Sequence, residues 1–411
     1  MKVLQVNCVY AKGSTGKITY DLHKALTEKG FESAVCFGRG ERVNEPDVYK
    51  TSWELYSKIN NLLSRITGIM YGGCFFSTNR LISVIKREKP DIVHLQCING
   101  YFVNIYRLIG WLKKRGIKTV LTLHAEFMFT ANCGCSFDCE KWKTGCGNCP
   151  DYKNVTKSLF FDRTAVSYKK MKNAFEGFDG KLIVTSVSPW LMERAKQSPI
   201  LKDKKHTVVM NGLDTDIFHI YDTESIKKKY CITDEKIIFY AAPYFTDNPN
   251  YIKGGNYIIE LAKRLKDENV RIFVAGEYDS GLKVPENIVL LGKIENQREL
   301  AEFYSMADVT VITSKKETFS MICAESLCCG TPVAAFRAGG PETIALADYS
   351  AFADYGELDG LCDCIKTLLA KSSSPTLISA AGKAAYSRER MTDEMISVYI
   401  ELMKGKPMCR Q

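Results

Sequence analysis

Short apolar runs alternate with amphipathic stretches along most of the chain. The opening run MKVLQVNCVY is typical of a buried strand, and apolar positions three to four residues apart between Lys17 and Lys29 predict a helix after it. Further runs predict a helix at 257–266, an amphipathic helix at 389–404, and strands at 90–95, 119–123, 237–242, 270–275, 288–291 and 308–313. Strands and helices that alternate in this way predict doubly wound parallel sheets, an α/β fold.

The length of 411 residues is too great for one hydrophobic core and suits two domains. A new strand–helix series begins at Ile237, so we place the domains at 1–205 and 206–387, followed by a C-terminal segment at 388–411. Hydrophobic residues make up 45% of the chain and charged residues 25%, which is typical of a globular protein. No apolar run approaches the roughly 18 residues of a membrane span or has the form of a signal peptide, so we expect a cytoplasmic location.

The stretch 317–341, which reads ETFSMICAESLCCGTPVAAFRAGGP, carries the candidate chemistry. It predicts a loop with Glu317, a helix at about 319–329 that ends before Gly330, a strand at 333–336 and a new helix opened by Pro341. Both helix N-termini would present unpaired backbone N–H groups at one end of the sheet. Such groups suit a phosphate.

Glu317 and Glu325 would lie roughly 10 Å apart, at about 1.5 Å per helical residue. Carboxylates accept bidentate hydrogen bonds from vicinal hydroxyls, so each could hold one sugar of a nucleotide diphosphate sugar. The alternative is a solvated loop residue and a helix-surface residue, which describes most glutamates. Spacing alone favours this alternative.

The string as a whole resembles the signature of the family 4 retaining glycosyltransferases of GT-B architecture. In that signature Glu-x7-Glu is followed by a glycine and by Pro-Val, here Gly330, Pro332 and Val333. Ser320 stands where the family usually has glycine. The resemblance implies two Rossmann-like domains facing each other across a cleft, no catalytic cofactor, and a front-face mechanism in which the departing diphosphate takes the acceptor's proton.

The resemblance extends to positions outside this stretch. It implies that His124, at the end of TVLTLH, reaches the donor sugar, that Lys253 contacts the diphosphate, and that Glu317 completes the catalytic set. The same resemblance implies that Lys293 lies against the nucleobase and that a C-terminal helix packs back on the first domain. The donor-binding positions that follow are Glu325, Gly16, Lys17, Lys293, Phe319, Ser320 and Met321.

Some of these positions have alternatives. A histidine at the end of a buried strand is more often packed than catalytic, and His94 is a second candidate for the histidine role. Asn248 stands where the family has arginine, so Lys17 or Arg337 would supply the second positive charge near the diphosphate. The glycine loop at 11–16 does not match a P-loop, because the required first glycine and the final hydroxyl are missing.

A cysteine-rich insert at 132–150 contains five of the sixteen cysteines. Its string KWKTGCGNCP resembles the branch of family 4 that includes colanic-acid and capsular-polysaccharide glycosyltransferases. In a reducing cytosol thiolate clusters select zinc, so the spacing suits either a structural zinc site or an unmetallated loop with free thiols. The expected ligands are Cys135, Cys139, Cys146 and Cys149, with Cys133 as a competing fourth ligand.

Together these features imply a retaining glycosyltransferase that moves a sugar from a nucleotide diphosphate donor, foremost a UDP-sugar, to a hydroxyl of a lipid-linked bacterial surface polysaccharide intermediate. The net charge of +9 fits a phosphate-rich substrate or peripheral binding to an anionic inner membrane face. A sugar-nucleotide epimerase of the same fold is the nearest alternative. A zinc-containing nucleic-acid-binding protein would leave the 317–341 stretch unexplained, so we expect no nucleic acid partner.

Overall fold

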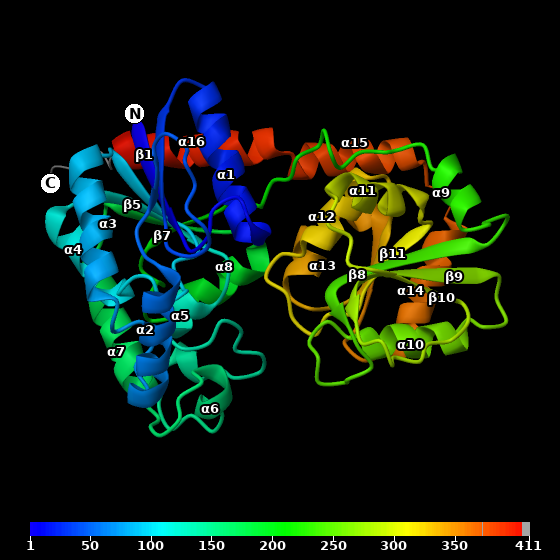
Figure 1. Ribbon diagram of the computed structural model, residues 1–411, viewed down its shortest axis with the longest axis horizontal. Coiled ribbons are helices and arrows are strands. Elements are labelled where there is room, and N and C mark those ends of the chain that lie inside the picture. Colours follow the sequence, from blue (N-terminus) through cyan, green and yellow to red (C-terminus); the bar gives the residue numbers. More distant parts are fainter. Residues whose placement is uncertain (372, 405–411) are drawn as a thin grey trace, which may run out of the picture. The chain divides into compact units, whose positions relative to one another are not determined.

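The computed structural model describes residues 1–371 and 373–404. These residues form two compact units: unit 1 comprises Met1–Met210 and the chain from Met391 onward, and unit 2 comprises Asn211–Arg390 (Figure 1). The division falls after residue 210, whereas the sequence analysis places it after residue 205. Positions 405–411 of the expected C-terminal segment lie outside the described residues.

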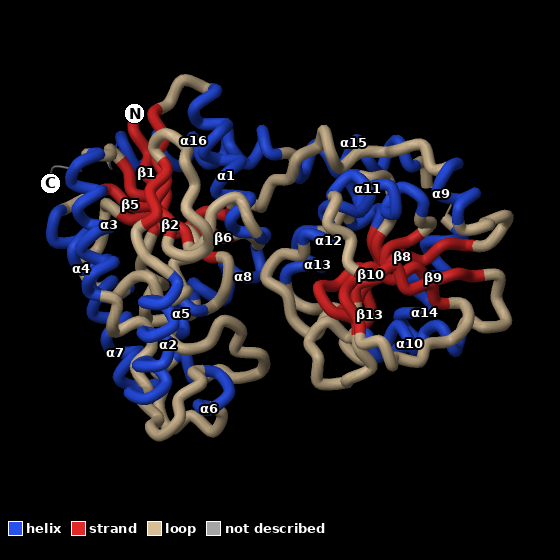
Figure 2. The backbone as a smooth tube through the Cα atoms, in the orientation of Figure 1, coloured by secondary structure: helices blue, strands red, loops and turns tan. Residues whose placement is uncertain are grey.

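Unit 1 is built on a parallel sheet of seven strands in the order β3-β2-β1-β4-β5-β6-β7 (Figure 2). Strands β2 and β3 lie on one side of β1, and the chain then crosses over so that β4 pairs with the other side of β1. The switch point of the sheet therefore lies between β1 and β4. The strands are β1 (Lys2–Asn7), β2 (Glu32–Phe37), β3 (Val48–Lys50), β4 (Ile92–Leu95), β5 (Lys118–Leu123), β6 (Leu182–Ser186) and β7 (Lys205–Val208).

The helices of unit 1 include the C-terminal one. They are α1 (Gly13–Glu28), α2 (Glu54–Thr67), α3 (Phe75–Glu88), α4 (Ile105–Arg115), α5 (Phe127–Thr130), α6 (Tyr152–Val155), α7 (Thr164–Phe175), α8 (Pro189–Lys196) and α16 (Arg388–Lys404), with a 3₁₀ turn η1 (Lys141–Lys143). Helix α1 begins four residues before the expected start, because the glycine-rich segment after β1 already forms its first turn.

Helix α16 completes the core of unit 1. Its buried side chains Met395, Val398, Tyr399 and Leu402 lie in one cluster with residues of α1 and of the central strands, among them Ile18, Leu22, Ile92 and Val120. Each fully buried side chain of this size contributes about 1.5–3 kcal/mol. The first and the last described elements of the chain therefore share a core.

Unit 2 is built on a parallel sheet of six strands in the order β10-β9-β8-β11-β12-β13. Its switch point lies between β8 and β11, since β9 and β10 extend to one side and β12 and β13 to the other. The strands are β8 (Lys236–Phe245), β9 (Val270–Tyr278), β10 (Ile288–Gly292), β11 (Val309–Ile312), β12 (Val333–Phe336) and β13 (Ser350–Ala353).

Helices cover both faces of the second sheet. Successive side chains of β8 point to opposite faces and pack on different helices. Ile238 and Tyr240 join the cluster with α10 and α14, whereas Phe239 between them packs on Phe303 and Tyr304 of α11, at ring distances of 5.9 and 5.0 Å. The helices are α9 (Glu224–Lys229), α10 (Gly255–Arg264), α11 (Gln297–Met306), α12 (Met321–Cys328), α13 (Gly340–Ile344), α14 (Leu358–Ala370) and α15 (Pro375–Tyr386), with a 3₁₀ turn η2 (Ala347–Tyr349).

The expected α/β fold of two doubly wound parallel sheets is thus confirmed. Each of the strands expected from apolar runs overlaps an observed one. Within residues 1–371 and 373–404, no helix is both long and apolar enough to cross a membrane.

Candidate active site

A charged pair lies at the switch point of unit 2. Lys253 comes from the loop after β8 and Glu317 from the loop after β11, and their Nζ and Oε1 atoms are 2.8 Å apart. Ser314 donates a second hydrogen bond to the same carboxylate oxygen, at 2.6 Å. Open α/β sheets bind ligands at the carboxyl ends of the strands beside the switch point, so this pair stands where a ligand is expected.

The backbone of Glu317 is fixed from a third loop. Its N–H donates to the carbonyl of Ala338 at 2.9 Å, and its carbonyl accepts from Gly340 at 2.8 Å. A Cβ at Gly340 would lie 2.5 Å from the carbonyl carbon of Thr318, so this close approach requires glycine. The loops after β11 and β12 are therefore joined, and the carboxylate is held in place before any ligand arrives.

The backbone of Lys253 is fixed as firmly. Tyr240 and Thr313 each donate a side-chain hydrogen bond to its carbonyl oxygen at 2.9 Å. The next residue, Gly254, has φ of +69°, and a Cβ there would lie 2.3 Å from the carbonyl oxygen of Thr313. The backbone of Lys253 is thus held in a fixed turn, and from this turn its side chain reaches Glu317.

Helix α12 begins next to Glu317, and its first residues are three of the expected donor-binding positions. Ser320 has φ of +88°, and its Oγ accepts from the N–H of Cys323 at 3.4 Å. Phe319 is buried with its ring against Tyr386, so its side chain anchors the loop and is not available to a ligand. Any ligand contact at this terminus would come from backbone N–H groups, which have no acceptor within the helix.

The second helix N-terminus differs from the expectation. The carboxylate of Glu342 accepts hydrogen bonds from the N–H groups of Ala338 and Gly339, at 2.8 to 3.0 Å. These groups are therefore already satisfied by the protein and are not open to a phosphate. The signal was present in the sequence, because a glutamate three residues after the start of a helix commonly caps it. The expectation of two open N-termini was wrong in this respect.

Glu325 lies in the second turn of α12 and is partly buried. The hydroxyl of Tyr304 on α11 donates to its Oε2 at 3.0 Å. Burial raises the pKa of this carboxyl to about 7, because the charged form loses hydration. The carboxyl of Glu325 therefore keeps its proton to a higher pH than an exposed glutamate does, because its pKa is raised, and its sequence position did not indicate this.

Lys293 follows β10 and does not join this group of residues. Strand β9 separates β10 from β8, and the Lys293 ammonium pairs with Glu295 at 3.0 Å and with Glu277 at 3.7 Å. Arg337, the expected source of a second charge, pairs with Asp354 at 3.3 Å. The structure thus brings together Lys253, Glu317 and the start of α12, while the side chains of Lys293 and Arg337 pair with carboxylates outside this group.

The expected residues of unit 1 gather near its own switch point. His124 follows β5, and its Nε2 donates to Oε1 of Gln96, which follows β4, at 2.8 Å. Gln96 in turn donates to Gln5 of β1 at 3.2 Å. Burial lowers the pKa of His124 to about 4, so its imidazole is neutral at physiological pH and offers hydrogen bonds but no charge.

Gly16 and Lys17 lie in the first turns of α1, beside β1. The carbonyl of Gly16 accepts from the N–H of Ala11 at 3.0 Å, which closes the loop that precedes the helix. The Lys17 ammonium is 3.3 Å from the buried Asp21 one turn further on. This cation is therefore already partly neutralised within its own helix.

His94 has a structural role. It is fully buried at the end of β4, where Nδ1 bonds the hydroxyl of Tyr399 on α16 and Nε2 bonds the hydroxyl of Thr122 on β5, both at 2.7 Å. Burial lowers its pKa to about 3. Both ring nitrogens are used inside unit 1, so His94 fastens the C-terminal helix to the sheet.

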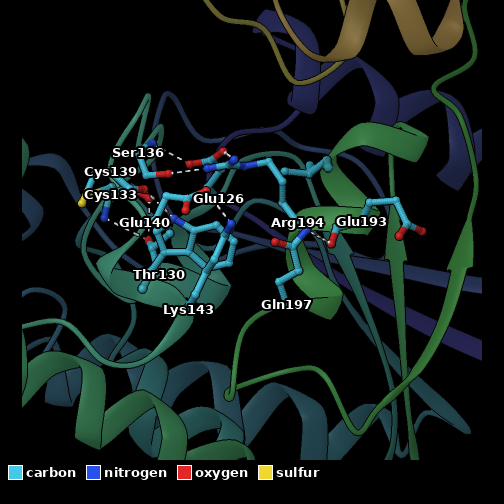
Figure 3. A network of polar contacts seen from close by, with 12 residues as sticks. Glu126, Thr130, Cys133, Ser136, Cys139, Glu140, Lys143, Glu193, Arg194 and Gln197 are labelled. Atoms are coloured by element: carbon cyan, nitrogen blue, oxygen red, sulfur yellow. Dashed lines mark hydrogen bonds and ion pairs between the residues drawn. The ribbon is translucent and has the colours of Figure 1, made fainter.

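The cysteine-rich insert is held by a buried ion pair (Figure 3). Arg194 on α8 pairs with Glu126 at 2.6 Å and donates to Ser136 at 2.7 Å, while the backbone N–H of Ser136 donates to Glu126 at 2.5 Å. The guanidinium also lies 4.9 Å from the ring centroid of the buried Trp142. Glu126, two positions after His124, therefore has the structural role of holding the insert through Arg194 and Ser136.

The zinc site expected at Cys135, Cys139, Cys146 and Cys149 is not supported. Within residues 1–371 and 373–404, no group of three or more His, Cys, Asp or Glu side chains is arranged to hold a metal ion. The thiol of Cys146 instead contacts the carbonyl of Thr130 at 3.6 Å, and burial raises its pKa to about 11. The contacts that order the insert in the structure are the Arg194–Glu126 ion pair and the packing of Arg194 on Trp142, and the alternative of an unmetallated loop with free thiols fits them.

Comparisons with known proteins agree with this geometry. A family model described as Glycosyl transferases group 1 matches residues 222–385, and one described as Glycosyltransferase Family 4 matches residues 15–217. WcaC of Escherichia coli K12, named as a colanic acid biosynthesis glycosyl transferase, is 22% identical over 425 residues, covering 98% of this chain and all of that protein. The N-acetyl-alpha-D-glucosaminyl L-malate synthase of Bacillus anthracis is 22% identical over 97% of both chains.

A solved structure with the same fold is that of HepE from Anabaena in complex with UDP. It has a TM-score of 0.62 and 14% sequence identity, over 97% of this chain and 99% of that chain. Two parallel sheets of seven and six strands, together with these matches, define a glycosyltransferase of GT-B architecture. The chain belongs to glycosyltransferase family 4, and the family expected from the 317–341 stretch is confirmed.

Proposed function

We propose that this enzyme is a retaining glycosyltransferase that transfers a sugar from a nucleotide diphosphate donor, foremost a UDP-sugar, to a hydroxyl of a lipid-linked bacterial surface polysaccharide intermediate. The observation that carries the donor class is the Lys253–Glu317 pair at the switch point of unit 2. HepE, which shares the fold, has been solved with UDP and with UDP-glucose, and this supports a uridine nucleotide.

The acceptor class rests on the names of two relatives and on one string of the insert. WcaC carries the name of a surface polysaccharide pathway, and the insert string KWKTGCGNCP resembles that branch. The relative from Bacillus anthracis, equally identical, is named N-acetyl-alpha-D-glucosaminyl L-malate synthase, and that name contains a small hydroxy acid. We therefore treat the glycan acceptor as the first class to test and a small hydroxy acid as the second.

In the proposed reaction the bond between the anomeric carbon and the diphosphate oxygen breaks, and the diphosphate leaves with the electron pair. The acceptor hydroxyl forms its bond to the same face of the anomeric carbon, and its proton passes to the departing diphosphate oxygen. No protein base is needed. The configuration at the anomeric carbon is retained because the entering and leaving oxygens use one face.

We assign Lys253 to the diphosphate, where negative charge grows as the bond breaks. Loss of one such preorganised contact in other enzymes costs about 10²–10³-fold in turnover. The ammonium starts 2.8 Å from Glu317, and the fixed turn at Gly254 means that binding requires only the side chain to shift. The backbone N–H groups at the start of α12, from Ser320 and Met321, are assigned to the same diphosphate.

We assign Glu317 to the transferred sugar, as a hydrogen-bond acceptor and a negative charge near the developing oxocarbenium ion. Glu325 is assigned to the ribose. Because Tyr304 already donates to its Oε2, we expect Oε1 to accept from one ribose hydroxyl, in place of the bidentate contact that spacing suggests. The remaining assignments follow family resemblance: the sugar for His124, the diphosphate for Gly16 and Lys17, and the nucleobase side for Lys293.

A donor screen tests the proposal. The purified enzyme is incubated separately with UDP-, GDP-, ADP- and TDP-sugars, and binding is followed by thermal shift. A ligand at 100 times its Kd stabilises the native state by about 2.7 kcal/mol. We expect a UDP-sugar to stabilise unit 2, and we expect transfer, followed by mass spectrometry, to polyprenyl diphosphate-linked sugars.

Matched variants separate binding from chemistry. Glu317→Gln should keep the thermal shift and lose turnover, and Lys283→Ala, an exposed lysine of the same unit, should change neither. Proton NMR of the product gives the anomeric configuration. An inverted product contradicts the retaining mechanism, and an epimerised nucleotide sugar formed without acceptor favours the epimerase.

A further inference from the structure

Helix α2 is packed with its polar side inward. Its buried residues are Ser57, Asn60 and Ser64, while its apolar side chains Leu55, Ile59, Leu62, Leu63 and Ile66 are 39–67% exposed. The polar side is satisfied by the rest of unit 1. Asn60 accepts from the N–H of Cys74 at 2.7 Å, and Ser64 donates to the carbonyl of Ile69 at 2.9 Å. These contacts fix which side of the helix faces outward.

Two neighbouring segments extend this apolar surface. Phe75 and Phe76 at the start of α3 are 55% and 72% exposed, and the N–H of Phe76 bonds the hydroxyl of Tyr56 on α2 at 3.2 Å. The N–H of Leu159, in the segment that follows α6, bonds the carbonyl of Arg65 at 2.8 Å (Figure 1). We call the whole surface the α2 face; its exposed members are Trp53, Leu55, Ile59, Leu62, Leu63, Ile66, Phe75, Phe76, Leu159, Phe160 and Phe161.

This concentration is unusual for a protein surface. Seventeen large hydrophobic side chains are exposed among the described residues, and the α2 face holds eleven of them. Contiguous apolar patches of this kind mark sites of interaction with a protein or a membrane. The charges around the face distinguish between these two.

The charged residues of the three segments 53–67, 75–80 and 157–163 are mostly basic and exposed. The bases are Lys58, Arg65, Arg80, Lys157 and Arg163, and the acids are Glu54 and Asp162. Both acids are engaged within the protein, Glu54 by Arg39 at 2.7 Å and Asp162 by Thr164 and Cys149. Aromatic members lie next to cations, with the Arg163 guanidinium 5.6 Å from the Phe161 ring.

We propose that the α2 face docks on an anionic lipid bilayer. An amphipathic helix with aliphatic and aromatic side chains outward and basic residues beside them lies in the interface of a membrane, with the apolar side chains at the acyl boundary and the bases at lipid phosphates. A second copy of the chain fits less well, because self-pairing would bring two basic rims together. The observations that support this docking are those of the exposed surface, and they do not depend on the proposed sugar transfer. The docking extends the proposed function because it indicates where on the protein a lipid-linked acceptor would be met.

Vesicle co-sedimentation tests the docking. The full chain is mixed with vesicles of phosphatidylcholine, with and without phosphatidylglycerol, at low and high salt. We expect binding to the anionic vesicles that weakens with salt, and a decrease of about tenfold or more in the partition coefficient for Leu62→Ser/Leu63→Ser. Lys58→Glu/Arg80→Glu should abolish the preference for phosphatidylglycerol.

Controls use exposed residues elsewhere. Leu377→Ser removes a side chain of unit 2 that is 62% exposed, and Lys283→Glu reverses an exposed charge there, so both should leave vesicle binding unchanged. The thermal unfolding midpoint should be the same for all variants because every changed side chain is exposed. Equal vesicle binding by the α2 variants and the wild type overturns the proposal.

A second outcome would overturn it in favour of another partner. Light scattering that shows a dimer dissociated by Leu62→Ser/Leu63→Ser, without vesicle binding, identifies the α2 face as a contact between copies. Vesicle binding is measured without donor or acceptor. A failure of sugar transfer therefore leaves this test intact, and a failure of docking leaves the donor screen intact.

Discussion

The switch points of the two sheets have the same topology but different chemistry. Unit 2 places an ion pair there, Lys253 with Glu317, whereas unit 1 places His124, whose lowered pKa keeps it neutral, on the amide of Gln96. A diphosphate needs a cation that is already in position, and unit 2 holds Lys253 against Glu317 at 2.8 Å, whereas the Lys17 cation of unit 1 pairs with Asp21 of its own helix at 3.3 Å. The two switch points therefore differ in the residue that follows the central strands, a charged pair in unit 2 and a neutral imidazole on an amide in unit 1.

Removing the cation should give the largest effect. We expect Lys253→Ala to lower kcat about 10²–10³-fold, because the leaving diphosphate loses its counter-charge. The variant should also lose stability, by about 1–3 kcal/mol, since Glu317 keeps a largely buried charge with no ammonium beside it. UDP release and thermal unfolding measure the two effects.

The double variant separates the two roles of Lys253. Lys253→Ala/Glu317→Ala removes both charges and should recover much of the lost stability without recovering turnover. A double variant as unstable as the single one would mean that the pair does not couple in the folded state, and Lys253→Arg should keep most of the stability.

Replacing His94 should lower mainly the stability of the protein, and replacing His124 should lower mainly its turnover. His94→Ala leaves the hydroxyls of Tyr399 and Thr122 without their partner in a fully buried place, and we expect a loss of about 2–4 kcal/mol in the free energy of unfolding. His124→Ala should cost less stability and should lower kcat for the donor sugar. Denaturant unfolding and steady-state kinetics on both variants test this, and the reverse pattern would exchange their roles.

Glu325 should make stability depend on pH. Its pKa is raised to about 7 from the ordinary value of 4.5, so the folded state binds more protons than the unfolded state between these values. The stability that the protonated form provides is present at acidic pH and is lost as pH rises through about 7, by about 1–3 kcal/mol for this partly exposed group. Thermal unfolding should be less pH-dependent in Glu325→Gln, and unchanged dependence would show that another group titrates; Glu286→Gln, an exposed glutamate, is the control.

The smallest effect concerns Ser320. Its φ of +88° is costly for a residue with a side chain, and its capping hydrogen bond is long at 3.4 Å. We expect Ser320→Gly to stabilise unit 2 by about 1 kcal/mol by relieving this strain, and Ser320→Ala to destabilise it because the strain stays and the cap is lost. If thermal unfolding shows the same sign for both variants, strain is not the reason.

The sequence indicated residues of unit 2 that the structure brings together, because they lie in one local string or in a glycine-marked turn. Glu317 and Lys253 were found this way, and the glycine that the family prefers at position 320 now has a physical reason in the positive φ. The cap by Glu342 could have been predicted from GGPE. The raised pKa of Glu325 could not, since it arises from packing against a different helix.

The regions that the sequence did not predict depend on long-range contacts. The insert is ordered by Glu126 and Arg194, which are 68 positions apart, and spacing between cysteines carries no information on that pair. The orientation of α2 depends on the contact of Asn60 with Cys74 and on the bonding of Arg65 to the segment after α6. A helical pattern gives the two sides of such a helix but not which of them is covered.

The hydrogen bond between His94 and Tyr399 joins positions 305 apart, and it has a consequence for the order of folding during synthesis. The sheet of unit 1 leaves the ribosome before unit 2, but the side chains of α16 that complete its core leave only after unit 2. Unit 2 has its whole sequence available earlier and can fold while unit 1 waits with Ile18, Leu22 and Val120 incompletely covered. Because contacts so distant in sequence form slowly, apolar side chains of the nascent first unit stay exposed until α16 has been made.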